Sequence, residues 1–217
     1  MTQKNIAEHV KSHLDSDFVV KKSLSKSIVS FRALARHLIE KLDLKESNMD
    51  AVISAIRRYK KIGNGEVEKN LTKLFSKIAV KTRSDIVDIR VHKNKRSVEC
   101  ISKLNSVVDI EKGEIIRVIQ AEQSITIIFD DKNMGKFHDI FSRNDCISVD
   151  KKLVEINLQF TEDAKDIKGI IALVASSLNS ESINIVEIMS SAPELLVIVK
   201  KEDLLKALNV IDKLQSF

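Results

Sequence analysis

Apolar residues recur at helical spacing in three stretches of the first 60 residues, with polar residues between them. This spacing predicts three amphipathic helices that each bury one face. Ser30 precedes the second stretch, and Ser47 or Asn48 precedes the third, as expected of N-cap residues. The three sets are Ile6, Val10 and Leu14; Phe31, Leu34, Ala35, Leu38, Ile39 and Leu42; and Met49, Val52, Ile53, Ile56 and Tyr59.

Short connections and a glycine cluster define a first module. Residues 43–47 join the second and third predicted helices, a length typical of a helix-turn-helix pair. Residues 18–29 leave room for another short helix. Gly63-Asn64-Gly65 predicts a helix end and a domain boundary. We therefore expect a helical, helix-turn-helix-like module over residues 1–65, followed by a connecting helix over residues 66–76.

From residue 77 onwards the apolar residues alternate with polar ones, which predicts strands, and helical stretches interrupt them. The order strand, helix, strand, strand, helix occurs twice, displaced by about 70 residues, which indicates a duplicated ferredoxin-like unit. We predict an α+β protein in which the helical module precedes two βαββαβ domains, residues 77–150 and 151–217. The expected strands are 86–91, 115–120, 124–129 and 146–149 in the first repeat, and 153–160, 183–189 and 195–199 in the second.

One edge of the repeated sheets needs a partner. The second repeat has no counterpart of strand 146–149, whereas residues 76–81 are an extra strand-like stretch ahead of the first repeat. Because an open sheet edge favours pairing with any available strand, we expect residues 76–81, or a symmetry partner, to cover an edge.

Charge separates the module from the repeats. Residues 1–65 carry 13 Lys and Arg against 7 Asp and Glu, whereas the whole chain of 217 residues has a net charge of +5. All the excess positive charge is therefore N-terminal. It indicates an anionic partner, nucleic acid before membrane. The alternative is a lysine-rich solvated surface.

The third predicted helix carries a mostly basic stripe opposite its apolar face. In a helix-turn-helix reader, such a helix enters the major groove of double-stranded DNA. Asp50 in its first half would repel phosphate, and the helix dipole favours cations in a last turn regardless of function. The candidate DNA contacts are Ser54, Arg57, Arg58 and Lys61 on this helix, and Arg32 and Arg36 on the second.

A family resemblance is carried by segments 166–172, Leu178, 182–188, 196–199 and 203–208, with 28–36 and 55–59. On these segments the second repeat resembles an ACT domain of the aspartate-kinase type, and the first repeat follows its pattern. The whole chain is similar to an uncharacterised archaeal ACT-domain family of predicted regulators of amino-acid metabolism. The resemblance implies a regulator that binds an amino acid and forms a dimer. Lys168 stands where the family pattern has proline.

Two segments of the second repeat form the candidate effector site: Ile167, Lys168 and Gly169, and Ile183, Asn184 and Ile185. Gly169 opens a helix, whose free backbone N–H groups suit a carboxylate. The Asn184 amide can both donate and accept a hydrogen bond. Together they could hold an amino acid between two such units. Alternatively, Gly169 serves a tight turn and Asn184 caps a sheet edge.

Catalysis has little support in the sequence. Common nucleotide-binding, zinc-protease and serine-hydrolase motifs are absent, and the five histidines are scattered. Cys100 and Cys146 have no CxxC pattern, and His9 and His13 have no further ligand nearby. We expect no enzyme, no cofactor and no metal site. With no apolar run of about 20 residues and no secretion signal, we expect a cytoplasmic protein without a membrane partner.

Three functions compete at this point. The leading one is an amino-acid sensor that alters DNA binding, that is, a transcriptional regulator of amino-acid metabolism. The second is a regulatory subunit that does not bind DNA and docks on a biosynthetic enzyme. The third is an ACT-like scaffold that no longer binds a ligand.

Overall fold

The computed structural model describes residues 3–60 and 65–216. The chain divides into two compact units, Met1–Lys69 and Asn70–Phe217. No helix within the described ranges is long and apolar enough to cross a membrane.

The first unit is built from helices around one apolar core. The three predicted stripes are confirmed as buried helix faces, and residues 18–25 form the additional short helix. Ile6, Val10 and Leu14 meet Leu38 and Ile56 in the core. The elements are α1 (Gln3–Ser16), α2 (Phe18–Ser25), α3 (Phe31–Lys41), a 3₁₀ turn η1 (Glu46–Asn48) and α4 (Met49–Lys60).

Polar contacts set the helix starts and crossings in this unit. Ser30 is the N-cap of α3, as predicted, and its hydroxyl accepts a hydrogen bond from the Ala33 backbone N–H at 3.4 Å. Tyr59 on α4 donates its hydroxyl to the Asp15 carboxylate on α1 at 2.7 Å. Burial and this hydrogen bond to Asp15 raise the pKa of Tyr59 to about 12. The bond therefore ties the end of α4 to the end of α1.

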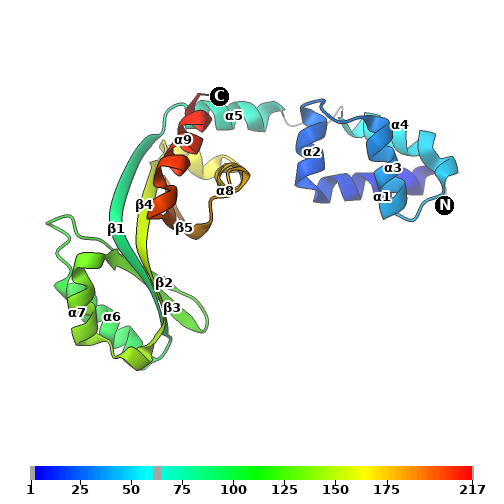
Figure 1. Cartoon of the computed structure of the whole chain (residues 1–217). Helices are drawn as coiled ribbons and strands as arrows, with labels where there is room; N and C mark the ends of the chain where they lie inside the picture. The colour runs from blue at the N-terminus through cyan, green and yellow to red at the C-terminus, as the bar shows by residue number, and fades with distance from the viewer. Residues whose placement is uncertain (1–2, 61–64, 217) are drawn as a thin grey trace. The chain divides into compact units, whose positions relative to one another are not determined.

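The second unit is a curled antiparallel sheet with helices on its outer face (Figure 1). Its strands run in the order β2-β3-β1-β4-β6-β5. The strands are β1 (Ala79–His92), β2 (Ile116–Gln120), β3 (Ser124–Asp130), β4 (Cys146–Gln159), β5 (Ile185–Ser191) and β6 (Glu194–Lys200). The helices are α6 (Lys95–Val107), α7 (Met134–Ile140), α8 (Ile170–Ser180) and α9 (Leu204–Gln215), with 3₁₀ turns η2 (Asp131–Asn133), η3 (Arg143–Asp145), η4 (Glu162–Asp166) and η5 (Lys201–Asp203). Helix α5 (Gly65–Phe75) begins in the first unit and ends in the second.

Two long strands belong to both repeats, which corrects the predicted strand boundaries. Residues 146–149 and 153–160 were expected as separate strands, but β4 is continuous from Cys146 to Gln159. Likewise β1 contains residues 79–81 of the extra stretch together with the predicted strand 86–91. The chain bends instead of breaking, because Asp85 and Lys152 adopt positive φ angles of 58° and 57° at irregular points of the β1–β4 pairing.

Each repeat thereby supplies a strand segment to the other. Ala79 to Lys81 pair with Gln159 to Asn157, so the expected cover of an edge is confirmed for these residues. Residues 76–78, in contrast, lie in the turn before β1. At the other end, Cys146 and Val149 of β4 pair with Val91 and Ile89. One six-stranded sheet therefore contains both repeats.

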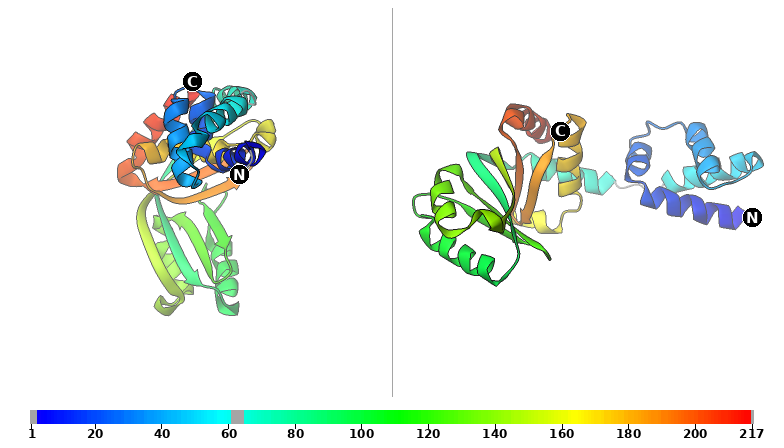
Figure 2. Two further views of the ribbon diagram at one scale, coloured as in Figure 1. Left: turned by 90° about the vertical axis from the view of Figure 1, so that its right-hand side faces the viewer. Right: turned by 60° about the horizontal axis from the view of Figure 1, so that its bottom comes forward.

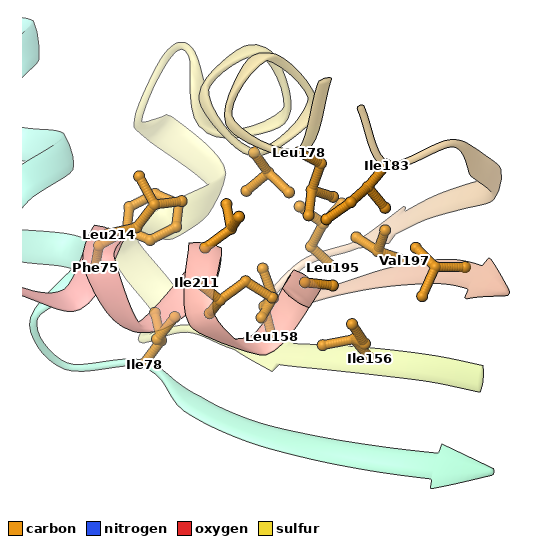
Figure 3. Packing of buried hydrophobic residues seen from close by; sticks show 14 residues of the cluster. Phe75, Ile78, Ile156, Leu158, Leu178, Ile183, Leu195, Val197, Ile211 and Leu214 are labelled. Atoms are coloured by element: carbon orange, nitrogen blue, oxygen red, sulfur yellow. The ribbon is translucent and has the colours of Figure 1, made fainter. Parts of the chain in front are cut away.

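Two helix layers cover the outer face, at opposite ends of β1 and β4 (Figure 2). At the first-repeat end, α6 and α7 pack on β1 and β3, and the Phe137 ring stacks with those of Phe129 and Phe141. At the second-repeat end, α8 and α9 pack on β4 and β6 together with the end of α5 (Figure 3). There Ile156, Val197 and Leu178 are fully buried.

The inner face of the curl combines a small apolar cluster with ion pairs. Ile86, Ile128, Leu153 and Ile198 are buried there. Residues of the edge strands β2 and β5, among them Ile119 and Met189, pack against this cluster.

Salt bridges between residues far apart in the sequence lie on the same face. Arg117 of β2 makes two hydrogen bonds to Glu155 of β4, at 3.2 and 3.1 Å. Arg83 of β1 contacts Asp130 at 2.8 Å, and the other Asp130 oxygen accepts the Ile115 backbone N–H. The Arg117–Glu155 pair thus connects two strands that are not neighbours in the sheet, whereas the Arg83–Asp130 pair connects the neighbours β1 and β3.

We predict that truncating a buried side chain of β4 lowers the free energy of unfolding much more than truncating an exposed one. Ile156→Ala removes a fully buried side chain and should lower the free energy of unfolding of the second unit by about 2–5 kcal/mol. Ile147→Ala, on the same strand but 46% exposed, should cost less than about 1 kcal/mol. Urea unfolding followed by circular dichroism measures both. Equal losses would contradict the packing described for β4.

Candidate functional site

The start of α8 is the feature that the sequence analysis singled out. Gly169 directly precedes the helix with φ 94° and ψ 4°, a left-handed conformation that favours glycine. Its carbonyl accepts the Leu173 backbone N–H at 2.9 Å, and no side chain caps the helix. The backbone N–H groups of the first turn and the positive end of the helix dipole therefore remain available to an anion.

A cleft of about 600 Å³ lies beside this helix start. Its wall is formed by η4, the first turn of α8 and the turn between β5 and β6. Most of the lining is apolar, and two of the described lining residues, Lys165 and Glu194, carry opposite charges. The apolar lining consists of Phe160, Ala164, Ile167, Ile170, Ile171, Ala172, Ala192, Pro193 and Leu195, and Gly169 and Ser190 complete the wall.

Glu194 is held in place by neighbouring amides. The Gln159 side-chain N–H donates to its carboxylate at 2.8 Å. Hydrogen bonds from Gln159 and Asn157 lower the pKa of Glu194. The cleft wall thus includes a residue that is anionic at neutral pH. The sequence analysis did not select Glu194, because its link to the Gly169 loop depends on the β5–β6 turn.

The structure divides the predicted effector residues between two places. Ile167 and Gly169 line the cleft, and Lys168 between them is exposed. Ile183 is buried in the core, Asn184 is exposed, and Ile185 begins β5. These last three residues follow the C-terminus of α8.

Within one repeat the two groups are well separated. The eleven residues of α8 span about 16 Å at 1.5 Å per residue. Gly169 and Asn184 therefore lie at opposite ends of this helix.

The corresponding helix of the first repeat has a closed start. Only Lys93 and Asn94 separate β1 from α6, whereas ten residues separate β4 from α8. The Asn94 side chain caps α6 by accepting the Ser97 backbone N–H at 2.9 Å. The Ser97 side chain is fully buried and donates to the His92 carbonyl at 2.6 Å. The two repeats thus differ at the start of this helix, which has a side-chain cap in the first repeat and none in the second.

The predicted DNA-contact residues of the first unit lie on two helices. Arg32 and Arg36 on α3 are exposed, as are Ser54, Arg57 and Arg58 on α4. Lys61 lies outside the described residues. None of these four arginines has an acidic partner within 4 Å among the described residues. Their charges are available to an external anion.

Metal ligands are not gathered in the described ranges. No group of three or more His, Cys, Asp or Glu side chains there is arranged to hold a metal ion. His9 and His13 both lie on α1.

Comparisons with known proteins place the fold. The chain matches no family model and no curated protein. The regulatory subunit of aspartate kinase from Thermus thermophilus is similar over 62% of this chain and 95% of its own, with a TM-score of 0.50 and 14% identity. Aspartate kinase from Clostridium acetobutylicum is similar over 63% of this chain and 34% of its own, with a TM-score of 0.52 and 18% identity.

A structure of aspartokinase alpha and beta subunits gives the same result, covering 64% of this chain and 98% of its own with a TM-score of 0.52 and 14% identity. The resemblance to ACT-type regulatory domains of aspartate kinase is therefore confirmed at the level of the fold. At these identities the likeness concerns architecture alone.

We predict that Gly169 is constrained by its backbone and not by lack of space. An added Cβ would lie 3.5 Å from Leu71 Cδ1, an ordinary contact, but the positive φ would strain any other residue. Gly169→Ala should therefore lower the unfolding free energy by about 1–2 kcal/mol. Gly135→Ala, in helix α7 with open space around it, should be neutral or stabilising by up to about 1 kcal/mol. Urea unfolding of both variants tests this contrast, and equal effects would contradict it.

Proposed function

We propose that this chain is an amino-acid-sensing regulatory protein whose effector binds in the cleft at the start of α8. The observation that carries the proposal is the uncapped helix start at Gly169, which opens into a cleft with Lys165 and Glu194 in its wall. An α-amino acid has a carboxylate and an ammonium group close together. The helix N-terminus and Lys165 suit the carboxylate, and the anionic Glu194 suits the ammonium group.

We further propose that the effector-binding form is a homodimer. Asn184 lies at the far end of α8 from the cleft, so Asn184 and Gly169 of one repeat cannot hold the same small molecule. A second copy could bring its own Asn184 to the cleft. In this arrangement residues 77–150 and 151–217 act as two ACT-like domains that share one sheet.

The proposed output of the sensor is DNA binding by the helical module, residues 1–65. Support comes from the exposed arginines on α3 and α4 and from the excess positive charge of this part of the chain. The α3–α4 pair would act as a helix-turn-helix. The alternative output is docking of the module on a biosynthetic enzyme, for which the same exposed helices would serve as the contact.

The effector site is tested by calorimetry on the full chain with each of the twenty amino acids. We expect one or a few to bind at or below millimolar concentration, and binding to weaken at least tenfold in Gly169→Val, which alters the helix start. Asn184→Ala should weaken binding as well if the second copy completes the site. Gly135→Ala is the control and should bind as the wild type does. Absence of binding by every amino acid at millimolar concentration would contradict the sensor function.

The DNA-binding output is tested by anisotropy with duplex DNA at several salt concentrations. Arg57→Ala with Arg58→Ala should weaken binding to all sequences. It should also lower the slope of log K against log salt by about 1–2, because each lost phosphate contact accounts for about 0.9. Lys95→Ala with Lys103→Ala, on α6, removes the same charge from the second unit and is the matched control. Equal affinities for the two double variants would favour the docking alternative.

A further inference from the structure

Asp88 is a buried acid in the middle of β1. The residue is 4% exposed, and it pairs with Asp150 across the β1–β4 ladder. Its other neighbour in the sheet is Ile128 of β3. The charged groups that act on it are Glu187 of β5, Asp150 of β4 and Arg90 of its own strand. Two of these three neighbours carry the same charge as Asp88.

The internal duplication provides the comparison. Asp88 corresponds to Glu155, 67 residues later, as Asp85 corresponds to Lys152 at the two positive-φ positions. Arg117 of β2 corresponds to Glu187 of β5, 70 residues later, as β3 does to β6. Across the curl, Glu155 therefore faces an arginine, Arg117. At the equivalent positions, Asp88 faces a second acid, Glu187.

The two pairs differ in how far a nearby arginine offsets their negative charge. Glu155 is also 4% exposed, but it accepts two hydrogen bonds from Arg117. Glu187 has a weaker partner, with its carboxylate 3.9 Å from the Arg90 guanidinium. Asp88 is therefore the less compensated of the two buried acids.

This environment favours the protonated form of Asp88. Burial, followed by the nearby charges of Glu187 and Asp150, raises the pKa of Asp88 to about 6, and Arg90 offsets only part of this. A carboxyl group that is charged at neutral pH therefore takes up a proton under mildly acidic conditions.

We propose that Asp88, Asp150 and Glu187 form a pH-sensitive latch across the inner face of the sheet, which draws β5 towards β1 when the cluster takes up a proton. Protonation removes the repulsion between Asp88 and Glu187. Val186 and Met189 of β5 and Ile86 of β1 already belong to one apolar cluster. Closure therefore strengthens an existing contact.

The direction of the pH effect follows from the raised pKa. Because the folded chain holds the proton more tightly than the unfolded chain, the stabilisation is complete below the ordinary aspartate pKa of 3.8. It is lost as the pH rises through about 6. The second unit should therefore become more stable between pH 7.5 and pH 5.

The test is thermal unfolding of the full chain between pH 7.5 and pH 5. Far-UV circular dichroism follows both units, whereas Tyr59, the one tyrosine of the chain, reports on the first unit alone. A transition in ellipticity without a change in the Tyr59 signal therefore belongs to the second unit. The wild-type transition should rise by about 3–5 °C over this range. Asp88→Asn mimics the protonated acid, so it should melt at least about 3 °C higher than wild type at pH 7.5 and respond less to pH.

Two further variants separate the latch from general destabilisation. Glu187→Gln removes one of the repelling charges and should move the midpoint of the pH dependence to lower pH. Glu155→Gln, at the equivalent position, should lower the melting temperature throughout, because it weakens the hold on the Arg117 side chain. The proposal is overturned if Asp88→Asn melts below wild type at pH 7.5, or if either Asp88→Asn or Glu187→Gln keeps the wild-type pH dependence.

Discussion

The pairing of β1 with β4 is the constraint on which the second unit depends. Both strands have 14 residues and pair along nearly their whole length, so each runs through both repeats. A straight ladder of this length would leave the inner face flat. Asp85 and Lys152 bend the strands where the repeats meet, and the edge strands β2 and β5 can then contact the inner cluster. Neither repeat has a complete sheet without a segment of the other.

Charges at the two bends are exchanged between the repeats. Asp85 contacts Lys201 at 2.7 Å, whereas the basic residue Lys151, beside Lys152, contacts Asp131 at 3.7 Å. Asp131 and Lys201 are equivalent positions, 70 residues apart. Each bend is thus linked to the 3₁₀ turn that follows β3 or β6, but with opposite polarity. The positive φ angle is retained at both bends although the residue identity is not, and both ion pairs are exposed, so they contribute little to the stability of the bends.

Local patterns predicted the elements, but not how the repeats combine. The stripes from Ile6 to Tyr59, the Ser30 cap and the duplicated order of strands and helices depend on nearest neighbours, and all appear in the structure. The joining of strand segments into β1 and β4 depends on positive φ at Asp85 and Lys152, and neither position has the glycine that would have marked it in the sequence. For the same reason, the sequence indicated Gly169 but not Glu194, which reaches the cleft only through the sheet order.

The repeats differ in how far their polar groups are satisfied: those of the first repeat have partners within the described part of the chain, and some of those in or facing the second do not. In the first, Asn94 caps α6, and Arg117 satisfies Glu155 across the curl. In the second, α8 has no side-chain cap, and β5 faces a buried acid. β5 also links the two features, because Glu187 lies within it and Ser190, near its end, lines the cleft. A ligand in the cleft and a proton at Asp88 would therefore act on the same edge strand. If both favour the same position of β5, the ligand raises the affinity of Asp88 for a proton, and the proton raises the affinity of the cleft for the ligand by the same factor.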